Sequence, residues 1–273
     1  MKEIRNLILD MDGVLWRGDT PMPGLTDFFE SLDEYGIGYV LATNNASKTA
    51  AMYTEKLARF GVRVPPERIL TSAEVTAVLL AETLAKGTPV YIVGAKGLHD
   101  ALAKQGFRAV TPQEVRAGKT AAAVVVGFSP HMTYEDVAMA SLLVQKGVPF
   151  IATNPDTTFP SELGPLPGAG SIVALITTAT GIEPTVIGKP GPIMFREAVK
   201  RLGGDSAHVA MVGDRLSTDI DGAMAAGLTS ILVLSGISTE EDVAASPVKP
   251  DFVFADIVEL AEYLASEMAP VHD

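Results

Sequence analysis

Two aspartates separated by one residue follow a short apolar run near the N-terminus. Residues 4–9 are mostly apolar and predict a buried strand, and the sequence Asp-Met-Asp-Gly of residues 10–13 comes directly after it. Side chains two residues apart on an extended backbone point the same way, so we expect Asp10 and Asp12 on one side of the chain. Two like charges about 4 Å apart repel by roughly 4 kcal/mol at an effective dielectric near 20. The pair therefore needs a proton, a cation or a division of roles, and it is a candidate catalytic site.

Three further polar clusters also follow apolar runs. Residues 43–45 (Thr-Asn-Asn) follow the run 37–42, and residues 188–190 (Gly-Lys-Pro) follow the run 185–187. Residues 213–219, which include Asp214 and Asp219, follow the run 208–212. Ligands of open α/β sheets bind outside the carboxyl ends of the strands. We therefore expect the four clusters to form one site at one end of a single sheet.

The elements that must position these residues alternate along the chain. Other apolar runs predict strands, and amphipathic stretches between them predict helices, many of them ending at a glycine. The further predicted strands are residues 90–93, 121–126, 148–152, 230–234 and 251–254, and the predicted helices include 24–35, 48–60, 134–145, 192–202, 218–226 and 257–268. This alternation is typical of an α/β fold with a parallel sheet and crossover helices.

About a hundred residues in the middle of the chain carry none of the four clusters. The interval starts near residue 85 and ends near residue 181, between the second and third clusters. We interpret residues 85–181 as an inserted α/β domain, with residues 1–84 and 182–273 as the two parts of the core.

Composition excludes several classes of protein. The chain has 273 residues, a formal net charge of −12 and no cysteine. The charge argues against nucleic-acid and anionic-membrane partners. The lack of cysteine excludes disulfides, a thiolate nucleophile and a cysteine-based zinc site. The first apolar run is too short for a signal peptide, and no apolar stretch approaches the length of a membrane span, so we expect a cytoplasmic protein.

Together the motifs resemble those of one superfamily. Residues 10–16 (D-M-D-G-V-L-W), 43–45, 188–190 and 213–219 (G-D-R-L-S-T-D) match, in order, the motifs of haloacid dehalogenase (HAD) superfamily phosphatases. The chain is most similar to the NagD-like and 4-nitrophenylphosphatase-like subgroup, and residues 153–156 and 167–171 resemble its cap. The resemblance implies a Rossmann-like, doubly wound parallel-sheet core with an inserted C2-type α/β cap.

The resemblance also implies a reaction and gives roles to the two leading acids. It predicts hydrolysis of a small-molecule phosphate monoester through an aspartyl-phosphate intermediate. Asp10 would be the nucleophile. Asp12 would protonate the leaving group and then accept a proton from the hydrolytic water.

Metal and phosphate ligands are assigned by the same resemblance. Asp10 and Asp214 would bind Mg²⁺ through their side chains and Asp12 through its backbone carbonyl, with Asp219 ligating through water or bracing the loop. Lys189 would offset negative charge, while Thr43, Asn44 and Asn45 would bind phosphoryl oxygens.

Each assignment has a purely structural alternative. Asp12 could stabilise a turn, Asp214 could cap the helix after Gly213, and residues 43–45 could form a capping turn. The one tryptophan, Trp16, is expected to serve packing rather than catalysis. In the cap, Asn154 and Asp156 could contact substrate, but a structural turn is at least as good an interpretation.

Two other activities and one assembly stay open. A receiver-like regulatory module also phosphorylates an aspartate beside Mg²⁺, but it has no use for Asp12 or for a cap. A haloacid-type dehalogenase uses a similar aspartate without Mg²⁺ or the second acid. A homodimer formed through the cap is a further possibility. The sequence does not identify the phosphate ester, because the cap has neither an aromatic cluster nor a basic patch.

Overall fold

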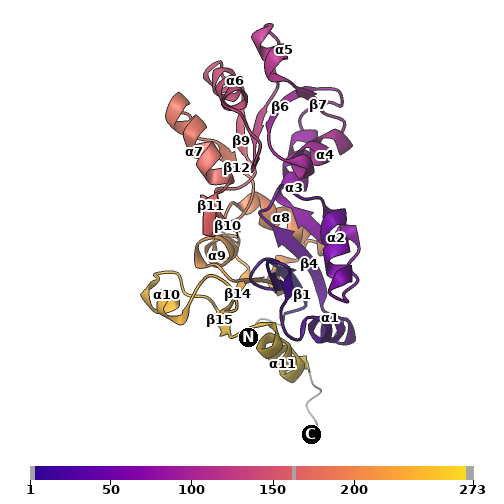
Figure 1. The fold of residues 1–273 in the computed structure, drawn as a ribbon. Coiled ribbons are helices and arrows are strands. Elements are labelled where there is room, and N and C mark those ends of the chain that lie inside the picture. The colour runs from indigo at the N-terminus through magenta and orange to yellow at the C-terminus, as the bar shows by residue number, and fades with distance from the viewer. Residues whose placement is uncertain (1–3, 162–163, 269–273) are drawn as a thin grey trace. The chain divides into compact units, whose positions relative to one another are not determined.

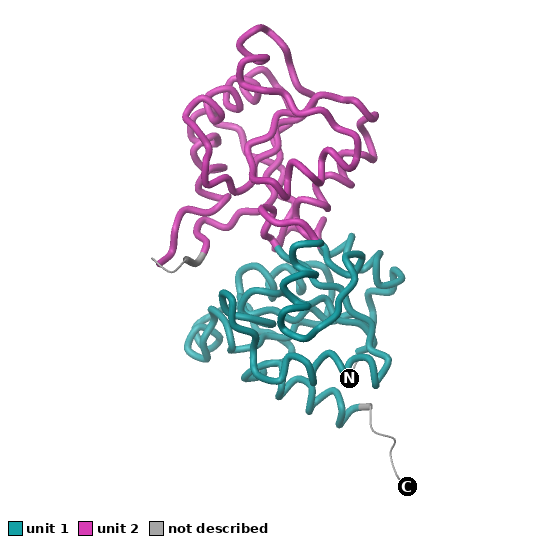
Figure 2. The backbone as a smooth tube through the Cα atoms, turned by 45° about the vertical axis from the view of Figure 1, so that its right-hand side comes forward, with its two compact units in different colours: residues 1–43, 51–70, 195–273 teal, residues 44–50, 71–194 magenta. Residues whose placement is uncertain are grey.

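The computed structural model describes residues 4–161 and 164–268, which form two compact units. The first consists of residues 1–43, 51–70 and 195–273, and the second of residues 44–50 and 71–194. Figure 2 shows the two units in different colours. The chain thus leaves the first unit after Thr43, returns to it for residues 51–70, and returns a second time at Phe195.

The first unit is built around a six-stranded sheet in the order β15-β14-β13-β1-β4-β5. Figure 1 labels β1, β4, β14 and β15 of this sheet. Its strands are β1 (Asn6–Leu9), β4 (Gly38–Thr43), β5 (Ile69–Thr71), β13 (Val209–Gly213), β14 (Thr229–Val233) and β15 (Phe252–Phe254), and β2 (Trp16–Arg17) and β3 (Thr20–Pro21) form a separate antiparallel hairpin. The helices of this part are α1 (Leu25–Glu34), α2 (Ala50–Arg59), α8 (Pro192–Arg201), α9 (Asp221–Ala225), α10 (Glu240–Ala245) and α11 (Ile257–Met268).

The strand β1 lies at the centre of this sheet. Leu7, Ile8 and Leu9 are completely buried, as expected for a strand covered on both faces. The strand pairs in parallel with β4 on one side and with β13 on the other, and Leu9 lies opposite both Leu41 and Val212. The sheet grows from β1 toward β4 and β5, and then from its other side toward β13, β14 and β15. This reversal is the topological switch point of a doubly wound fold, where ligands bind.

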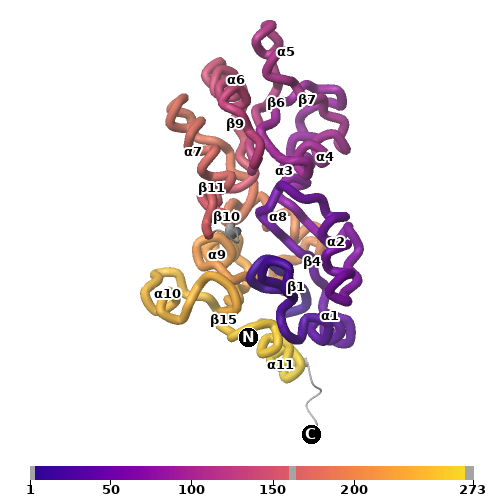
Figure 3. The backbone as a smooth tube through the Cα atoms, in the orientation of Figure 1, coloured from indigo at the N-terminus to yellow at the C-terminus, as the bar shows by residue number. Residues whose placement is uncertain are grey.

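The N-terminal and C-terminal parts of the sequence therefore share one sheet. Figure 3 colours the backbone from indigo at the N-terminus to yellow at the C-terminus, so that both parts can be followed. The predicted α/β core with a parallel sheet is confirmed. Helix α6 (Tyr134–Gln145) and helix α11 have the predicted bounds. Helix α6 begins after Thr133, whose hydroxyl accepts a hydrogen bond from the Asp136 N–H while the Asp136 carboxylate bonds back to the Thr133 N–H.

The second unit contains a five-stranded parallel sheet in the order β12-β9-β8-β6-β7. Its strands are β6 (Pro89–Val93), β7 (Arg108–Val110), β8 (Val124–Val126), β9 (Phe150–Ala152) and β12 (Thr185–Val186), with a hairpin of β10 (Thr158–Ser161) and β11 (Gly164–Pro167). Its helices are α3 (Ser72–Ala81), α4 (Lys96–Lys104), α5 (Pro112–Arg116), α6 and α7 (Ala169–Thr180). Its buried core lies between the sheet and the helices α6 and α7, and includes Val124, Leu143 and Ile176.

One strand does not lie in the sheet where we expected it. The run 185–187 forms the short strand β12, which pairs with β9 in the five-stranded sheet, Thr185 lying opposite Ile151. Three polar clusters follow strands of the six-stranded sheet, but the Gly-Lys-Pro cluster follows a strand of the other sheet. The expectation of four strand ends on one sheet is therefore wrong in this respect. A two-residue edge strand has too few apolar residues for its sequence to specify its neighbour.

The expected boundaries of the inserted domain, after residues 84 and 181, stay a prediction. The strands of the second sheet extend from Pro89 to Val186. Over the described ranges of the chain, no helix has the length and apolar character needed to cross a membrane.

Candidate active site

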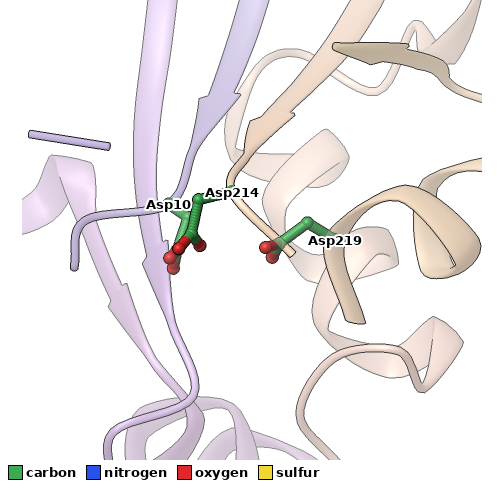
Figure 4. Close-up of side chains that lie close together, drawn as sticks. All are labelled: Asp10, Asp214 and Asp219. Carbon is green, nitrogen blue, oxygen red and sulfur yellow. The ribbon is translucent and has the colours of Figure 1, made fainter. Parts of the chain in front are cut away.

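Three carboxylates converge at the carboxyl edge of the six-stranded sheet. Asp10 follows β1, Asp214 follows β13, and Asp219 lies in a π-helical turn, Leu216–Ile220, after the same strand. One oxygen from each lies within 4.8 Å of the others (Figure 4). Asp214 and Asp219 are only 4% and 2% exposed. All three carboxylates can be ionised together at such short separations only beside a compensating cation.

The ligand set fits a hard divalent metal ion. Mg²⁺ and Ca²⁺ both prefer oxygen ligands, and carboxylates are the usual protein donors to them. The backbone N–H of Asp10 bonds to the Val212 carbonyl at 2.9 Å, which extends the parallel pairing of β1 and β13 and so fixes the start of the first acidic loop beside the second. The side chains of Asp10, Asp214 and Asp219 could hold such an ion, and ligation by the backbone carbonyl of Asp12 stays a prediction.

Backbone groups and glycines shape the position of Asp214. One carboxylate oxygen, Oδ2, accepts a hydrogen bond from the Ile237 N–H at 2.8 Å, and the Asp214 carbonyl accepts one from the Ser238 N–H at 3.0 Å. A β-carbon at Gly13 or at Gly236 would overlap the Asp214 carboxylate, and Gly13 also has a φ of +90°. The glycine of the first motif is thus required both by its backbone conformation and by the close approach of Asp214.

Asp219 also forms a hydrogen bond within its own loop. Its Oδ2 accepts a hydrogen bond from the Arg215 N–H at 3.1 Å, and a β-carbon at Gly213 would overlap its side chain. The carboxylate therefore closes its own loop and also faces Asp10 and Asp214. Whether it would ligate directly or through water stays a prediction.

The second acid of the first motif has a different environment. The Asp12 side chain is exposed, and its Oδ1 accepts a hydrogen bond from the Trp16 indole Nε1–H at 2.6 Å. The two acids of the motif therefore differ, since Asp10 belongs to the carboxylate cluster and Asp12 is bound by a neutral donor. Different environments are what opposite protonation states at the start of a reaction would require.

Thr43, at the end of β4, lies beside a buried phenol. Thr43 is buried, and its side chain acts to lower the pKa of the neighbouring Tyr53 hydroxyl. Burial, and then the negative charges of Asp12 and Asp10, raise the pKa of the Tyr53 hydroxyl far above its ordinary value of 10.0. The phenol therefore stays neutral and adds no charge to the acidic site. Nothing in the sequence of helix α2 marks Tyr53 as facing the site, so its position there was not predictable from the sequence.

Asn44 and Lys189 meet in the second unit. The Asn44 side chain accepts a hydrogen bond from the Lys189 N–H at 2.7 Å and donates one to the Lys189 carbonyl at 2.9 Å. Lys189 is 2% exposed, and a β-carbon at Gly188 would lie 2.5 Å from Asn44 Oδ1. The Asn44 amide thus holds the main chain of the lysine, a role that the expectation of a phosphate contact had not included.

The predicted cap residues brace the same asparagine. The Asn154 Nδ2 group donates to the Asn44 carbonyl at 2.7 Å, and the Asn44 amide lies 3.2 Å from Asp156 Oδ2. Asn154 Oδ1 also accepts from the Asp156 N–H at 3.1 Å, which closes a turn. Asn45 closes another turn, because its Oδ1 accepts hydrogen bonds from both the N–H and the hydroxyl of Ser47. Substrate contacts of these residues stay predictions.

We expect Asn44→Ala to lower the free energy of unfolding by about 2–4 kcal/mol, because the variant leaves the buried N–H and C=O of Lys189 without the partners that Asn44 supplies. Denaturant titration followed by circular dichroism measures the change. Asn45→Ala is the matched control, since its side chain bonds only to Ser47 among the contacts described above and the expected loss is about 1 kcal/mol. Equal losses in the two variants would contradict the role given to Asn44.

The chain is similar in sequence to known hydrolases. A family model described as haloacid dehalogenase-like hydrolase matches residues 7–108, and a related HAD-hydrolase-like model matches residues 186–260. An acid sugar phosphatase of Staphylococcus aureus is 38% identical over 259 residues, which are 95% of this chain and 97% of the relative.

Solved structures agree with this similarity. A 4-nitrophenylphosphatase from Thermotoga maritima superposes with a TM-score of 0.88 at 38% identity, covering 95% of this chain and 97% of its own. A glycerol phosphate phosphatase from Mycobacterium tuberculosis, solved in complex with magnesium, has a TM-score of 0.85 at 39% identity, covering 96% of this chain and 78% of its own. The same phosphatase has also been solved in complex with calcium.

Proposed function

The chain belongs to the family of haloacid dehalogenase-like hydrolases, and from this premise we propose that it is a Mg²⁺-dependent phosphatase of small-molecule phosphate monoesters. The observation that carries the proposal is the convergence of Asp10, Asp214 and Asp219 at the switch point of the core sheet. The relatives named above are phosphatases, which favours phosphate-ester hydrolysis over the receiver-like and dehalogenase alternatives.

The proposed reaction has two steps. In the first, a carboxylate oxygen of Asp10 forms a bond to phosphorus as the bond from phosphorus to the ester oxygen breaks, and Asp12 gives its proton to the departing oxygen. In the second, a water oxygen bonds to phosphorus and the Asp10–phosphorus bond breaks. Asp12 takes the proton of that water, so that inorganic phosphate leaves and both acids return to their starting states.

The cation and the surrounding groups support both steps. When bound, the metal ion neutralises the carboxylates and polarises the phosphoryl group. We propose, from the family resemblance, that Lys189 offsets charge on the phosphate and that Thr43 and Asn44 bind phosphoryl oxygens. We also propose magnesium as the ion, because the donors are hard oxygens and a similar phosphatase has been solved with magnesium.

The substrate is proposed to be a small phosphate ester. The net charge of −12 disfavours nucleic acids and anionic membrane surfaces. Sugar phosphates and glycerol phosphate are the first classes to test, because relatives that are 38% and 39% identical are named for them. A homodimer and a cytoplasmic location stay predictions.

We expect chelation to abolish the activity and Mg²⁺ to restore it. The protein is treated with EDTA, dialysed, and assayed for phosphate release from 4-nitrophenyl phosphate, sugar phosphates, glycerol phosphate, nucleotides, phosphoglycolate and pyridoxal phosphate. Ca²⁺ should restore less activity, since it takes six to eight ligands at longer distances than octahedral Mg²⁺. Full turnover in the presence of EDTA would overturn the metal dependence, and absence of phosphate release from every ester would overturn the proposed function.

A further inference from the structure

The environment of Trp16 suggests more than packing. Trp16 is completely buried, and its ring centroid lies 6.2 Å from that of Tyr53 in a stacked arrangement and 6.0 Å from that of Phe60. The Lys56 Nζ lies 4.5 Å from the ring centroid. Packing on several sides holds the indole ring in one orientation, and this also fixes the direction of its N–H bond.

One helix supplies the neighbours that confine the indole. Tyr53, Lys56 and Phe60 have the spacing i, i+3 and i+7, which places them on one face of α2 and its immediate continuation. Lys56 is itself fixed, because its Nζ donates to the Gly18 carbonyl at 2.6 Å and lies 3.7 Å from an Asp19 carboxylate oxygen. This cation over the ring face is attracted to the indole and polarises it.

The turn that follows the first motif brings the indole to Asp12. The Gly13 N–H bonds to the Trp16 carbonyl at 2.8 Å and the Leu15 N–H bonds to the Met11 carbonyl at 2.8 Å, so the chain folds back within four residues. A buried indole N–H needs an acceptor, and Asp12 Oδ1 at 2.6 Å is that acceptor. This distance is at the short end of N–H···O hydrogen bonds.

We propose that Trp16 is a positioning residue that holds Asp12 Oδ1, so that Oδ2 is the oxygen that gives and takes the proton. An indole N–H only donates, and the carbonyl oxygen of a carboxyl group is a better acceptor than its hydroxyl oxygen, so the contact favours the proton on Oδ2. The hydrogen bond therefore orients the carboxyl group and leaves Oδ2 as the oxygen that faces the reaction. This inference rests on the proposed function, in which Asp12 is the general acid and base.

The test uses the fact that the chain contains a single tryptophan. Replacement of tryptophan by its benzothienyl analogue, in which sulfur stands for the N–H, alters only residue 16 and retains the bicyclic ring. Trp16→Phe is a second variant that lacks the donor. Phe60→Leu is the matched control, since it loosens the packing against the indole and leaves the N–H in place.

Two substrates distinguish a loss of Asp12 positioning from a general disturbance of the active site. Phenolate is a poor leaving group that needs a proton, whereas 4-nitrophenolate leaves readily without one. We expect the analogue and Trp16→Phe to lower kcat/KM for phenyl phosphate by roughly 10- to 100-fold, as for loss of a hydrogen bond to a charged group, and to change kcat/KM for 4-nitrophenyl phosphate less than threefold. The kcat for 4-nitrophenyl phosphate should fall and a burst of nitrophenol should appear, because the second step still needs Asp12 as base.

A purely structural role would lower kcat/KM for both esters in parallel, which is the pattern expected of Phe60→Leu. Parallel losses in the benzothienyl protein, or none, would overturn the inference. The proposed function is tested separately in the same assays. Asp12→Asn should lose most phenyl phosphate hydrolysis and should accumulate phosphoenzyme with 4-nitrophenyl phosphate. A fully active Asp12→Asn would overturn the role of Asp12 itself, whatever the Trp16 variants do.

A spectroscopic readout tests the contact without turnover. In ¹⁵N-labelled protein the one indole N–H gives one side-chain resonance, which should lie downfield and exchange slowly. Asp12→Asn should move it upfield, whereas Asp19→Asn, which removes a carboxylate that faces Lys56 but not the indole N–H, should leave it close to its wild-type position. A resonance that ignores Asp12→Asn would overturn the proposed hydrogen bond.

Discussion

Asp10→Asn is expected to abolish phosphatase turnover, with a loss in kcat on the order of 10⁴- to 10⁶-fold, as for removal of other covalent nucleophiles. An amide oxygen is a poor nucleophile toward phosphorus, and the substitution changes the volume of the side chain very little. The backbone hydrogen bond from residue 10 to the Val212 carbonyl remains, so the loop keeps its place beside β13. Release of nitrophenol from 4-nitrophenyl phosphate measures the effect.

A chemical trap distinguishes loss of the nucleophile from loss of binding. Wild-type protein mixed with labelled substrate and quenched in acid should carry a phosphoryl group that hydroxylamine removes, and Asp10→Asn should carry none. Asp27→Asn, an exposed acid on α1 with the same change of charge, is the control and should behave as the wild type. Hydrolysis by Asp10→Asn at the wild-type rate would refute the assignment of the nucleophile.

Asp214→Asn is expected to raise the Mg²⁺ concentration required for half-maximal activity by at least about 100-fold, since loss of even an outer-shell partner costs 10- to 100-fold in metal affinity. Asparagine keeps an oxygen that accepts the Ile237 N–H, so the loop geometry is retained while one negative charge leaves the cluster. The dependence of the initial rate on Mg²⁺ concentration measures the change.

Thermal unfolding gives an independent measure of the same ligand. Mg²⁺ that binds only the folded protein raises the unfolding temperature of the wild type, and this increase should disappear in Asp214→Asn. Without metal the variant should unfold at the same or a higher temperature, because repulsion among the three carboxylates is relieved. Asp221→Asn, an exposed acid shortly after the cluster, is the control. An unchanged Mg²⁺ requirement in Asp214→Asn would contradict ligation by Asp214.

Much of the core was predictable from the sequence, because the residues that form apolar runs there are also the residues that the structure buries. The run before Asp10 is apolar on both faces, and the structure buries it between β4 and β13. Helices α6 and α11 have the predicted bounds. Each contains many apolar residues and has an acid that accepts hydrogen bonds from N–H groups at its start: Asp136 accepts from the Thr133 N–H, and Asp256 accepts from the Val258 N–H at 2.8 Å. The order of strands and motifs likewise predicted a site at the carboxyl edge of the sheet.

Other features depend on contacts between residues far apart in the chain. The hydrogen bond from the Asn44 amide to the Lys189 carbonyl joins residues 145 positions apart, and the one from the Asn154 amide to the Asn44 carbonyl joins residues 110 positions apart. Neither pair has a local pattern that would predict it. The sheet to which β12 belongs depends in the same way on its pairing with β9.

The sequence by itself determined the α/β class, the order of the motifs and the identity of the acids, because each of these follows from residue type, spacing and apolar periodicity. Only the tertiary structure decided that Asp219 joins Asp10 and Asp214, that Asn44 holds the lysine main chain, and that the buried Trp16 binds Asp12. The physical reason is that a hydrogen bond or a shared cation acts over a few ångströms in space. Distances of that size are set by how strands and helices pack, which no single stretch of sequence specifies.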